Sequence, residues 1–528
     1  MAEPAPDTNH EDRALSVAEL HHQDTVGDLL DEQKQRLPWF LVSLAFHAML
    51  FFIFSLIPVG KKGGGGEKEV ITNIVPEEIP EMIEPEREVL ETDKPIKQDE
   101  EPTEEPVIKD AEEADHNETA DEEDWEQSKG QEDQLSDKPF EGKGFLSNLG
   151  LGGGGGGTFG GRFGGRRDLV ARGGGGRRTE DAVNRGLKWL ADHQCEDGSW
   201  DTDGYEKECA RQGRPKDDPH GPCGTPGDME WTDPGNTGLC LLAFLGAGNT
   251  HRTGPYKDVV QKAIRYLKGI QSPDGCFGAK EGHYMYNHSI AGLAMAEAYA
   301  LSGKSPLIRG HAQKGIDFIA LAQNPGLAWR YSVKCGDNDT SVTGWVVMAL
   351  KSAKVAGLEV PRECFTGALT WVDKVTDETY WKVGYRSKGD PGARLTAVKD
   401  KFEATEAMTA VGMISRVFLG AKRDDPALRG GAELLVDQVP EWNDEKGTID
   451  MYYWYYGTLA MFQVGGSHWK KWNEAMKGAL VDTQRSEGGA SGSWDPIGAW
   501  GGPGGRVYST SINVLSLEIY YRYAKVFK

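Results

Sequence analysis

Six apolar helical segments recur along the last two thirds of the chain, and this repeat constrains the fold more than any other feature of the sequence. Each segment carries apolar residues on most helix faces, and their starts are separated by 51, 53, 64, 50 and 55 residues. A helix that is apolar all round is a buried helix. The six segments are 237–244, 288–296, 341–350, 405–413, 455–462 and 510–517.

Amphipathic helical segments alternate with the buried ones. They are 182–194, 256–271, 307–323, 361–375, 428–439 and 469–484. Six buried and six amphipathic helices make six hairpins. Because the chain begins on an outer-type helix and ends on an inner-type helix, the two ends can pair. The sequence therefore predicts an all-α fold, an (α/α)6 toroid of six helical hairpins over residues 179–528.

A short phrase of the form Gln-x-x-x-Gly-x-Trp recurs where amphipathic segments end. Glycine supplies the left-handed residue that ends a helix, an aromatic ring can cover the helix end, and glutamine can bond exposed backbone groups. The phrase occurs as Gln194, Gly198 and Trp200, as Gln271, Gly275 and Phe277, and as looser copies over 323–329 and 484–494.

The repeated phrase and the repeat period resemble those of the terpenoid cyclase and protein prenyltransferase superfamily, the squalene cyclase-like α/α-toroid proteins. The resemblance covers residues 179–528 and implies a toroid fold. If this domain is an enzyme, the resemblance implies terpenoid cyclase-like chemistry, an isomerase or lyase. A shared fold does not by itself imply a shared function.

The resemblance directs attention to Asp337 and Asp339 as catalytic candidates. Squalene–hopene cyclases carry an Asp-x-Asp-Asp-Thr segment at the start of an inner helix, where a carboxyl group protonates an alkene. Alignment on Thr340 places Asp339 on the last aspartate of that motif and Asn338 on the proton donor. The motif is degenerate here, and the alternative is that Asp339 caps the inner helix.

Zinc-dependent prenyl transfer is not expected. Prenyltransferases of this fold bind zinc through an Asp-x-Cys pair and a distant histidine, but Ser341 stands in place of that cysteine. Ser509 follows Tyr508 where a Tyr-His pair would be expected. A zinc site needs three or four protein ligands, so we expect no metal and no cofactor.

Aromatic residues gather near the starts of the inner segments. Aromatic faces stabilise cations and equally suit a sugar or lipid pocket, although such residues also fill ordinary helical cores. The residues that we expect to line a cavity in the ring are Tyr286, His288, Trp345, Tyr452, Trp454 and Tyr508.

Residues 37–59 form an uncharged stretch that is long enough to span a bilayer as a helix. We expect a transmembrane anchor preceded by a cytoplasmic segment, 1–36. Ser43 and His47 share one helix face, and this pair resembles the N-terminal anchor of TonB-type energy-coupling proteins. That resemblance implies a bacterial inner-membrane protein with a periplasmic C-terminal domain and a partner in the membrane. The alternative is that His47 faces lipid or a neighbouring helix.

Residues 60–178 lack apolar periodicity and are predicted to be a disordered linker. The stretch 67–137 contains 28 acidic and 6 basic residues, which accounts for nearly all of the chain's net charge of −23. Such a segment is extended by self-repulsion. Residues 150–176 are rich in glycine and arginine, a composition that can bind nucleic acid. We interpret this stretch as a flexible swivel and expect no nucleic-acid partner.

Seven cysteines leave at least one thiol unpaired. Cys209 and Cys223 lie in the insert 201–229, which is too long for a simple turn. A disulfide between them would suit an oxidising compartment; a metal site that includes His220, or free thiols, are the alternatives.

These observations leave three hypotheses. The first is a membrane-anchored toroid that binds an isoprenoid, a lipid or a protein partner without class II cyclase chemistry. The second is an active class II-type terpenoid cyclase that uses Asp337 and Asp339. The third is a structural module of a proton-driven envelope complex coupled through Ser43 and His47.

Overall fold

The computed structural model describes residues 162, 166–211, 224–391, 405–522 and 525–526. Within these ranges the regular structure is helical, apart from two isolated β-bridges. The prediction of an all-α repeat domain is confirmed. The predicted anchor 37–59, with Ser43 and His47, lies outside the described residues, and so do most of the linker and Cys223. Among the helices that the structure describes, none is long and apolar enough to cross a membrane.

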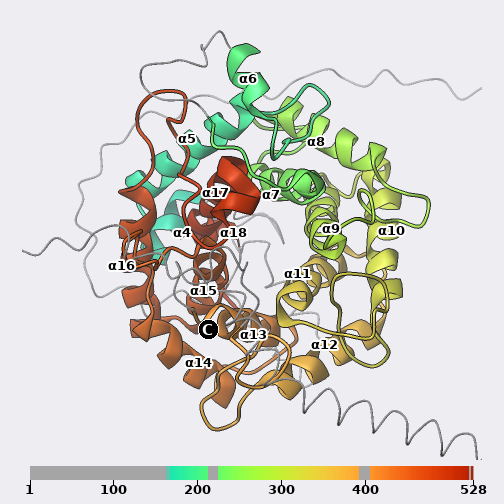
Figure 1. Ribbon diagram of the computed structural model, residues 1–528, viewed down its shortest axis with the longest axis vertical. Coiled ribbons are helices and arrows are strands. Elements are labelled where there is room, and N and C mark those ends of the chain that lie inside the picture. Colours follow the sequence, from blue (N-terminus) through green and yellow to red (C-terminus); the bar gives the residue numbers. More distant parts are fainter. Residues whose placement is uncertain (1–161, 163–165, 212–223, 392–404, 523–524, 527–528) are drawn as a thin grey trace, which may run out of the picture. The chain divides into compact units, whose positions relative to one another are not determined.

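The helices form two concentric layers, as Figure 1 shows. The inner helices are α7 (Asp233–Gly246), α9 (Tyr284–Leu301), α11 (Thr340–Ala356), α13 (Ala407–Phe418), α15 (Met451–Val464) and α17 (Gly501–Leu517). The outer helices are α5 (Arg177–Asp192), α8 (Lys257–Gly269), α10 (Pro306–Ala322), α12 (Arg362–Val375), α14 (Pro426–Asp437) and α16 (Gly466–Val481). Short helices α4 (Arg166–Gly173), α6 (Glu206–Arg211), η3 (Glu230–Thr232) and α18 (Ile519–Arg522) complete the described part.

Contacts between neighbouring inner helices run in chain order and end with α17 packed against α7, so the inner layer is a closed ring. The apolar pattern explains which helices are inside. Every residue of α9 except Tyr286 is buried. In α8 the buried residues are Val260, Ala263, Ile264 and Leu267, which form one helix face.

Where the repeat phrase occurs, it joins one outer helix to the next. Nε2 of Gln194 donates to the carbonyl of Val259 in α8, and Nε2 of Gln271 donates to the carbonyl of His311 in α10, both at 3.0 Å. Gln484 makes the same kind of bond to Ala182 in α5, at 2.8 Å, across 302 positions of sequence. The last repeat therefore contacts the first in the way that consecutive repeats contact each other.

The aromatic residue of the phrase caps the outer helix of its own repeat. Nε1 of Trp200 donates to the carbonyl of Leu190 at 2.8 Å, and Nε1 of Trp494 donates to the carbonyl of Leu480 at 2.7 Å. Both indole rings are fully buried. Each indole N–H thus pairs with a backbone carbonyl near a helix end, where the carbonyls have no intrahelical donor.

The ring has two different ends, because consecutive helices run in opposite directions. All inner helices begin at one end, which we call the mouth, and finish at the other, which we call the back. Connections at the back are short, for example 302–305 and 419–425. Connections at the mouth are longer, for example 323–339 and 482–500. The mouth therefore carries most of the loop structure, where binding residues are common.

The predicted linker boundary at residue 178 is wrong. Helix α4 begins at Arg166, and α5 begins at Arg177. Arg162 is also part of the folded domain, since its side chain is completely buried. The prediction failed because glycine and arginine surround these residues and hide any apolar periodicity.

Arg162 belongs to a network of buried charges at the back. Glu297 of α9 accepts hydrogen bonds from Arg162 and Arg522, each at 2.9 Å. Arg522 also pairs with Glu518 at 3.2 Å and donates to the carbonyl of Leu242 in α7 at 2.7 Å. The network ties the two ends of the described chain to the inner helices.

Candidate functional site

Asp339 is a buried carboxylate at the mouth, directly before α11. Its Oδ1 accepts a hydrogen bond from the backbone N–H of Val342 at 2.7 Å, so the residue caps the helix. Its Oδ2 accepts from the hydroxyl of Tyr385 at 3.3 Å and lies 3.8 Å from Nε of Arg330. The side chain has no solvent exposure. Burial raises the pKa of Asp339 to about 7. The helix amide and Arg330 favour the charged form and so partly oppose this rise.

Four tyrosines lie near this carboxylate, and a fifth, Tyr508, lies beside one of them, Tyr452. Tyr385 hydrogen-bonds to Tyr331 through their hydroxyl groups. The hydroxyl of Tyr452 lies 2.7 Å from Oγ of Ser341, two residues beyond Asp339. The tyrosines are Tyr286, Tyr331, Tyr385, Tyr452 and Tyr508. We call these five residues and Asp339 the mouth cluster.

Three tyrosines of the mouth cluster, Tyr286, Tyr331 and Tyr508, are half-buried. Tyr286 lies in an otherwise buried helix, and Tyr508 lies between Val507 and Ser509, which are buried. Among the described residues, no hydrogen bond uses the hydroxyl of Tyr286 or of Tyr508. Their rings are therefore partly exposed at the mouth, while burial raises the pKa of both hydroxyls.

The other residues expected to line a cavity lie elsewhere. Both ring nitrogens of His288 engage backbone, the N–H of Phe277 at 3.1 Å and the carbonyl of Gly315 at 3.0 Å. Trp345 stacks on Tyr455 deeper in the ring. Trp454 packs against Trp442, outside the mouth cluster.

Asp337 does not join Asp339. Its exposed carboxylate pairs with Arg330 and lies 3.8 Å from Nη1 of Arg386. Asn338, which alignment places on the proton donor, accepts from the N–H of Ala328 at 2.9 Å and so supports the loop. The two aspartates are thus separated into an exposed ion pair and a buried cap.

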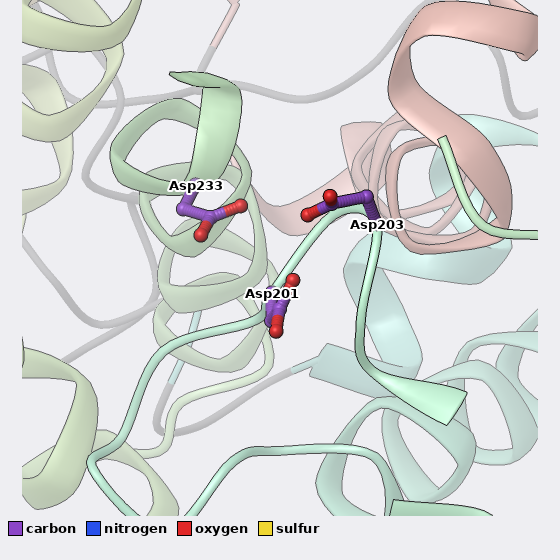
Figure 2. A group of neighbouring side chains, drawn as sticks. All are labelled: Asp201, Asp203 and Asp233. Atoms are coloured by element: carbon purple, nitrogen blue, oxygen red, sulfur yellow. The ribbon is translucent and has the colours of Figure 1, made fainter. Parts of the chain in front are cut away.

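Three other carboxylates converge at the mouth, as Figure 2 shows. Asp201 and Asp203 follow Trp200, and Asp233 begins α7; their ligand oxygens lie within 4.8 Å of one another. The N–H of Thr202 donates to Asp233 at 2.8 Å. Burial raises the pKa of Asp233 to about 6. Carboxylates in this arrangement are the ligand type that Ca²⁺ and Mg²⁺ accept.

Sequence reasoning missed Arg330, Tyr331 and Tyr385, which lie in connections rather than helices. The ring of Tyr331 stacks on His283 at 3.7 Å and is covered by the guanidinium of Arg330 at 4.6 Å. One available signal was position, because Arg330 and Tyr331 directly follow the phrase residue Trp329.

The described cysteines give no disulfide. Cys195, Cys240, Cys276, Cys335 and Cys364 are free thiols. Cys209 and Cys223 fall where side chains are outside the described residues, so their pairing stays a prediction.

Comparison with known proteins gives distant structural similarities. No family model matches the chain, and no curated protein matches it in sequence. A substituted type II terpene cyclase MstE from Scytonema, in complex with its product merosterolic acid A, has 12% identity and a TM-score of 0.42 over 65% of this chain and 96% of that chain. A substituted apo form of MstE gives 14% and 0.41 over 65% and 97%, and an α-amylase from Clostridium perfringens gives 11% and 0.37 over 54% and 85%. These similarities are distant, and the fold described above rests on the chain's own helix contacts.

The titration of Asp339 predicts a pH-dependent stability. Its pKa is about 7 in the folded chain and 3.8 ordinarily, so the folded state holds a proton that the unfolded state loses between about pH 4 and 7. Stability from this group therefore falls as pH rises through that window and is constant above it. Asp339→Asn keeps an oxygen for the cap and should flatten the fall, as measured by urea midpoints at successive pH values. Asp337→Asn, which removes the exposed carboxylate that shares Arg330 with Asp339, should leave the fall in place.

Proposed function

We propose that the ring is a binding module whose mouth takes an isoprenoid, a lipid or a segment of a protein partner. The observation that supports this most directly is the pair Tyr286 and Tyr508, whose half-buried rings lie at the mouth and whose hydroxyls make no hydrogen bond among the described residues. Aromatic faces bind apolar chains and the hydroxyls bind a polar end group, the usual composition of a ligand site. On the sequence prediction of an anchor at 37–59, the module is held to the inner membrane with its ring in the periplasm.

The state of Asp339 argues against class II cyclase chemistry. Protonation of an alkene needs a strongly acidic donor directed at the substrate. Asp339 has a pKa of about 7, its Oδ1 caps α11, and its Oδ2 accepts from Tyr385. A weak acid with both oxygens engaged suits a structural role better than proton donation to carbon.

The second candidate remains a class II-type cyclase. Asp339 favours it in one respect, because a pKa of about 7 leaves the carboxyl partly protonated at neutral pH. The structural-module hypothesis, with coupling through Ser43 and His47, rests on the sequence of the anchor. That hypothesis predicts that His47→Ala, or exchange of the anchor for an unrelated span, alters a phenotype. An unchanged phenotype in both would refute it.

Binding of a fluorescent polyprenol to the full-length protein in detergent tests the proposal. Tyr286→Ala and Tyr508→Ala should each weaken saturable binding about tenfold, because each removes an aromatic contact at the mouth. Tyr256→Ala is the matched control, since it removes the same half-buried side chain from the connection 247–256 at the back. Absence of saturable binding, or an equal effect of the control, would refute the polyprenol form of the proposal.

Product analysis separates binding from catalysis. We expect unchanged polyprenyl substrate after incubation with the wild-type chain. If a cyclised product forms and Asp339→Asn abolishes it while polyprenol binding persists, the cyclase hypothesis replaces the binding-module hypothesis.

A further inference from the structure

The two ends of the ring differ in charge. In the described connections at the mouth, acidic residues outnumber basic ones. At the back, basic residues outnumber acidic ones in the connections and α4 taken together. Exposed cations at the back are Arg252, Lys304, Lys422, Arg423, Lys470 and Lys525. Asp168, Glu359 and Asp424 are exposed acidic residues of the same end. The back therefore presents a positively charged surface.

An exposed apolar side chain lies within this surface. Leu307, in the first turn of α10, is 68% exposed. Lys304 precedes it and Arg309 follows it, and both are exposed. Oγ of Ser302 lies 2.9 Å from Nδ1 of His251, so the neighbouring connection with Arg252 is held beside them. Cations that flank an exposed leucine are typical of protein surfaces that contact the membrane interface, where the cations meet phosphates and the leucine enters the acyl boundary.

The described chain also begins at this end. Arg162 is buried in the charge network at the back, and α4 packs against α18. Charge, an exposed leucine and the first described residue of the chain therefore lie at the same end.

We propose that the back of the ring binds the headgroups of anionic phospholipids, so that the mouth faces away from the membrane. Each Lys or Arg near an anionic bilayer gains favourable electrostatic energy, and the gain disappears with screening by salt. This surface is separate from the mouth cluster, and its role does not depend on what the mouth binds.

Lysine reactivity in the full-length protein tests the orientation. The chain is mixed with vesicles of phosphatidylcholine alone or with about 30% phosphatidylglycerol, and acylation by an amine-reactive ester is followed by mass spectrometry. Lys304, Lys422 and Lys470 should react about fivefold more slowly with anionic vesicles, and about 0.5 M salt should remove the difference. Lys207, Lys388 and Lys446, which are exposed at the mouth, are the internal control.

Two charge-reversal variants of equal net charge complete the test. Lys304→Glu/Lys422→Glu/Lys470→Glu should abolish the protection of the remaining Lys471 at the back. Lys207→Glu/Lys388→Glu/Lys446→Glu should leave it intact. Protection that is equal at both ends, equal in neutral vesicles, or present in detergent alone would overturn the proposal, since none of these requires anionic lipid at the back.

Discussion

Replacement of Arg522 by Met is expected to destabilise the full-length protein by about 3–5 kcal/mol, the cost of breaking a buried ion pair from one side. The substitution leaves the carboxylates of Glu297 and Glu518 without a shared guanidinium, and both are buried. It also removes the donor to the carbonyl of Leu242 in α7. Urea unfolding followed by tryptophan fluorescence measures the loss.

The pKa values of the two carboxylates that Arg522 contacts are shifted in opposite directions, so the two should contribute differently to the loss of stability. Burial would raise the pKa of Glu297, but Arg522 and Arg162 together lower it. Burial raises the pKa of Glu518 to about 8, and its Oε1 has no hydrogen-bond partner among the described residues. Glu518→Gln added to Arg522→Met should therefore recover part of the lost stability, since an amide stays neutral on folding whereas the Glu518 carboxyl must take up a proton to be buried.

An exposed ion pair provides the control for Arg522. Arg178 lies 2.6 Å from Asp482, and both side chains are mostly exposed. Arg178→Met should not shift the unfolding midpoint measurably, because exposed pairs contribute little. If Arg522→Met and Arg178→Met had similar small effects, the network at the back would not be part of what holds the ring closed.

The sequence predicted the helical layers because their information is local. The apolar pattern of α9 and the one-sided pattern of α8 can each be recognised within a single helix. The repeat phrase is equally local, since Gln271 and Gly275 lie four positions apart. These features needed no knowledge of which helices are neighbours in space.

The mouth cluster could be predicted only in part, because its contacts join distant connections. Tyr385 reaches Asp339 across 46 positions, and Tyr331 and Tyr385 meet across 54. Residues in irregular connections follow no periodicity, so nothing in the sequence marks Tyr331 or Tyr385 as neighbours of a carboxylate. Arg162 is a further case, with partners 135 and 360 positions away.

The second large effect on stability is expected at the glycines of the repeat phrase. Gly275 has φ of +99°, and a Cβ there would lie 2.2 Å from the carbonyl oxygen of Lys314 in α10. Gly275→Ala is expected to cost about 3 kcal/mol, the sum of left-handed strain and overpacking against rigid backbone. Urea unfolding of the full-length chain measures it, and Gly198→Ala, at an equivalent position against Lys262, should behave alike.

Gly326 separates the two causes, because it is a left-handed glycine one position before Leu327, the residue that takes the place of Gly275 in a looser copy of the phrase. Its φ is +71°, but a Cβ there would meet nothing within 4 Å. Gly326→Ala should therefore cost about 1 kcal/mol or less, since strain is partly offset by the lower entropy of the unfolded chain. Equal losses at Gly275 and Gly326 would mean that the phrase needs glycine for its dihedral angle alone. A larger loss at Gly275 would show that glycine lets the next outer helix approach closely, which also brings the carbonyl of His311 within reach of Gln271.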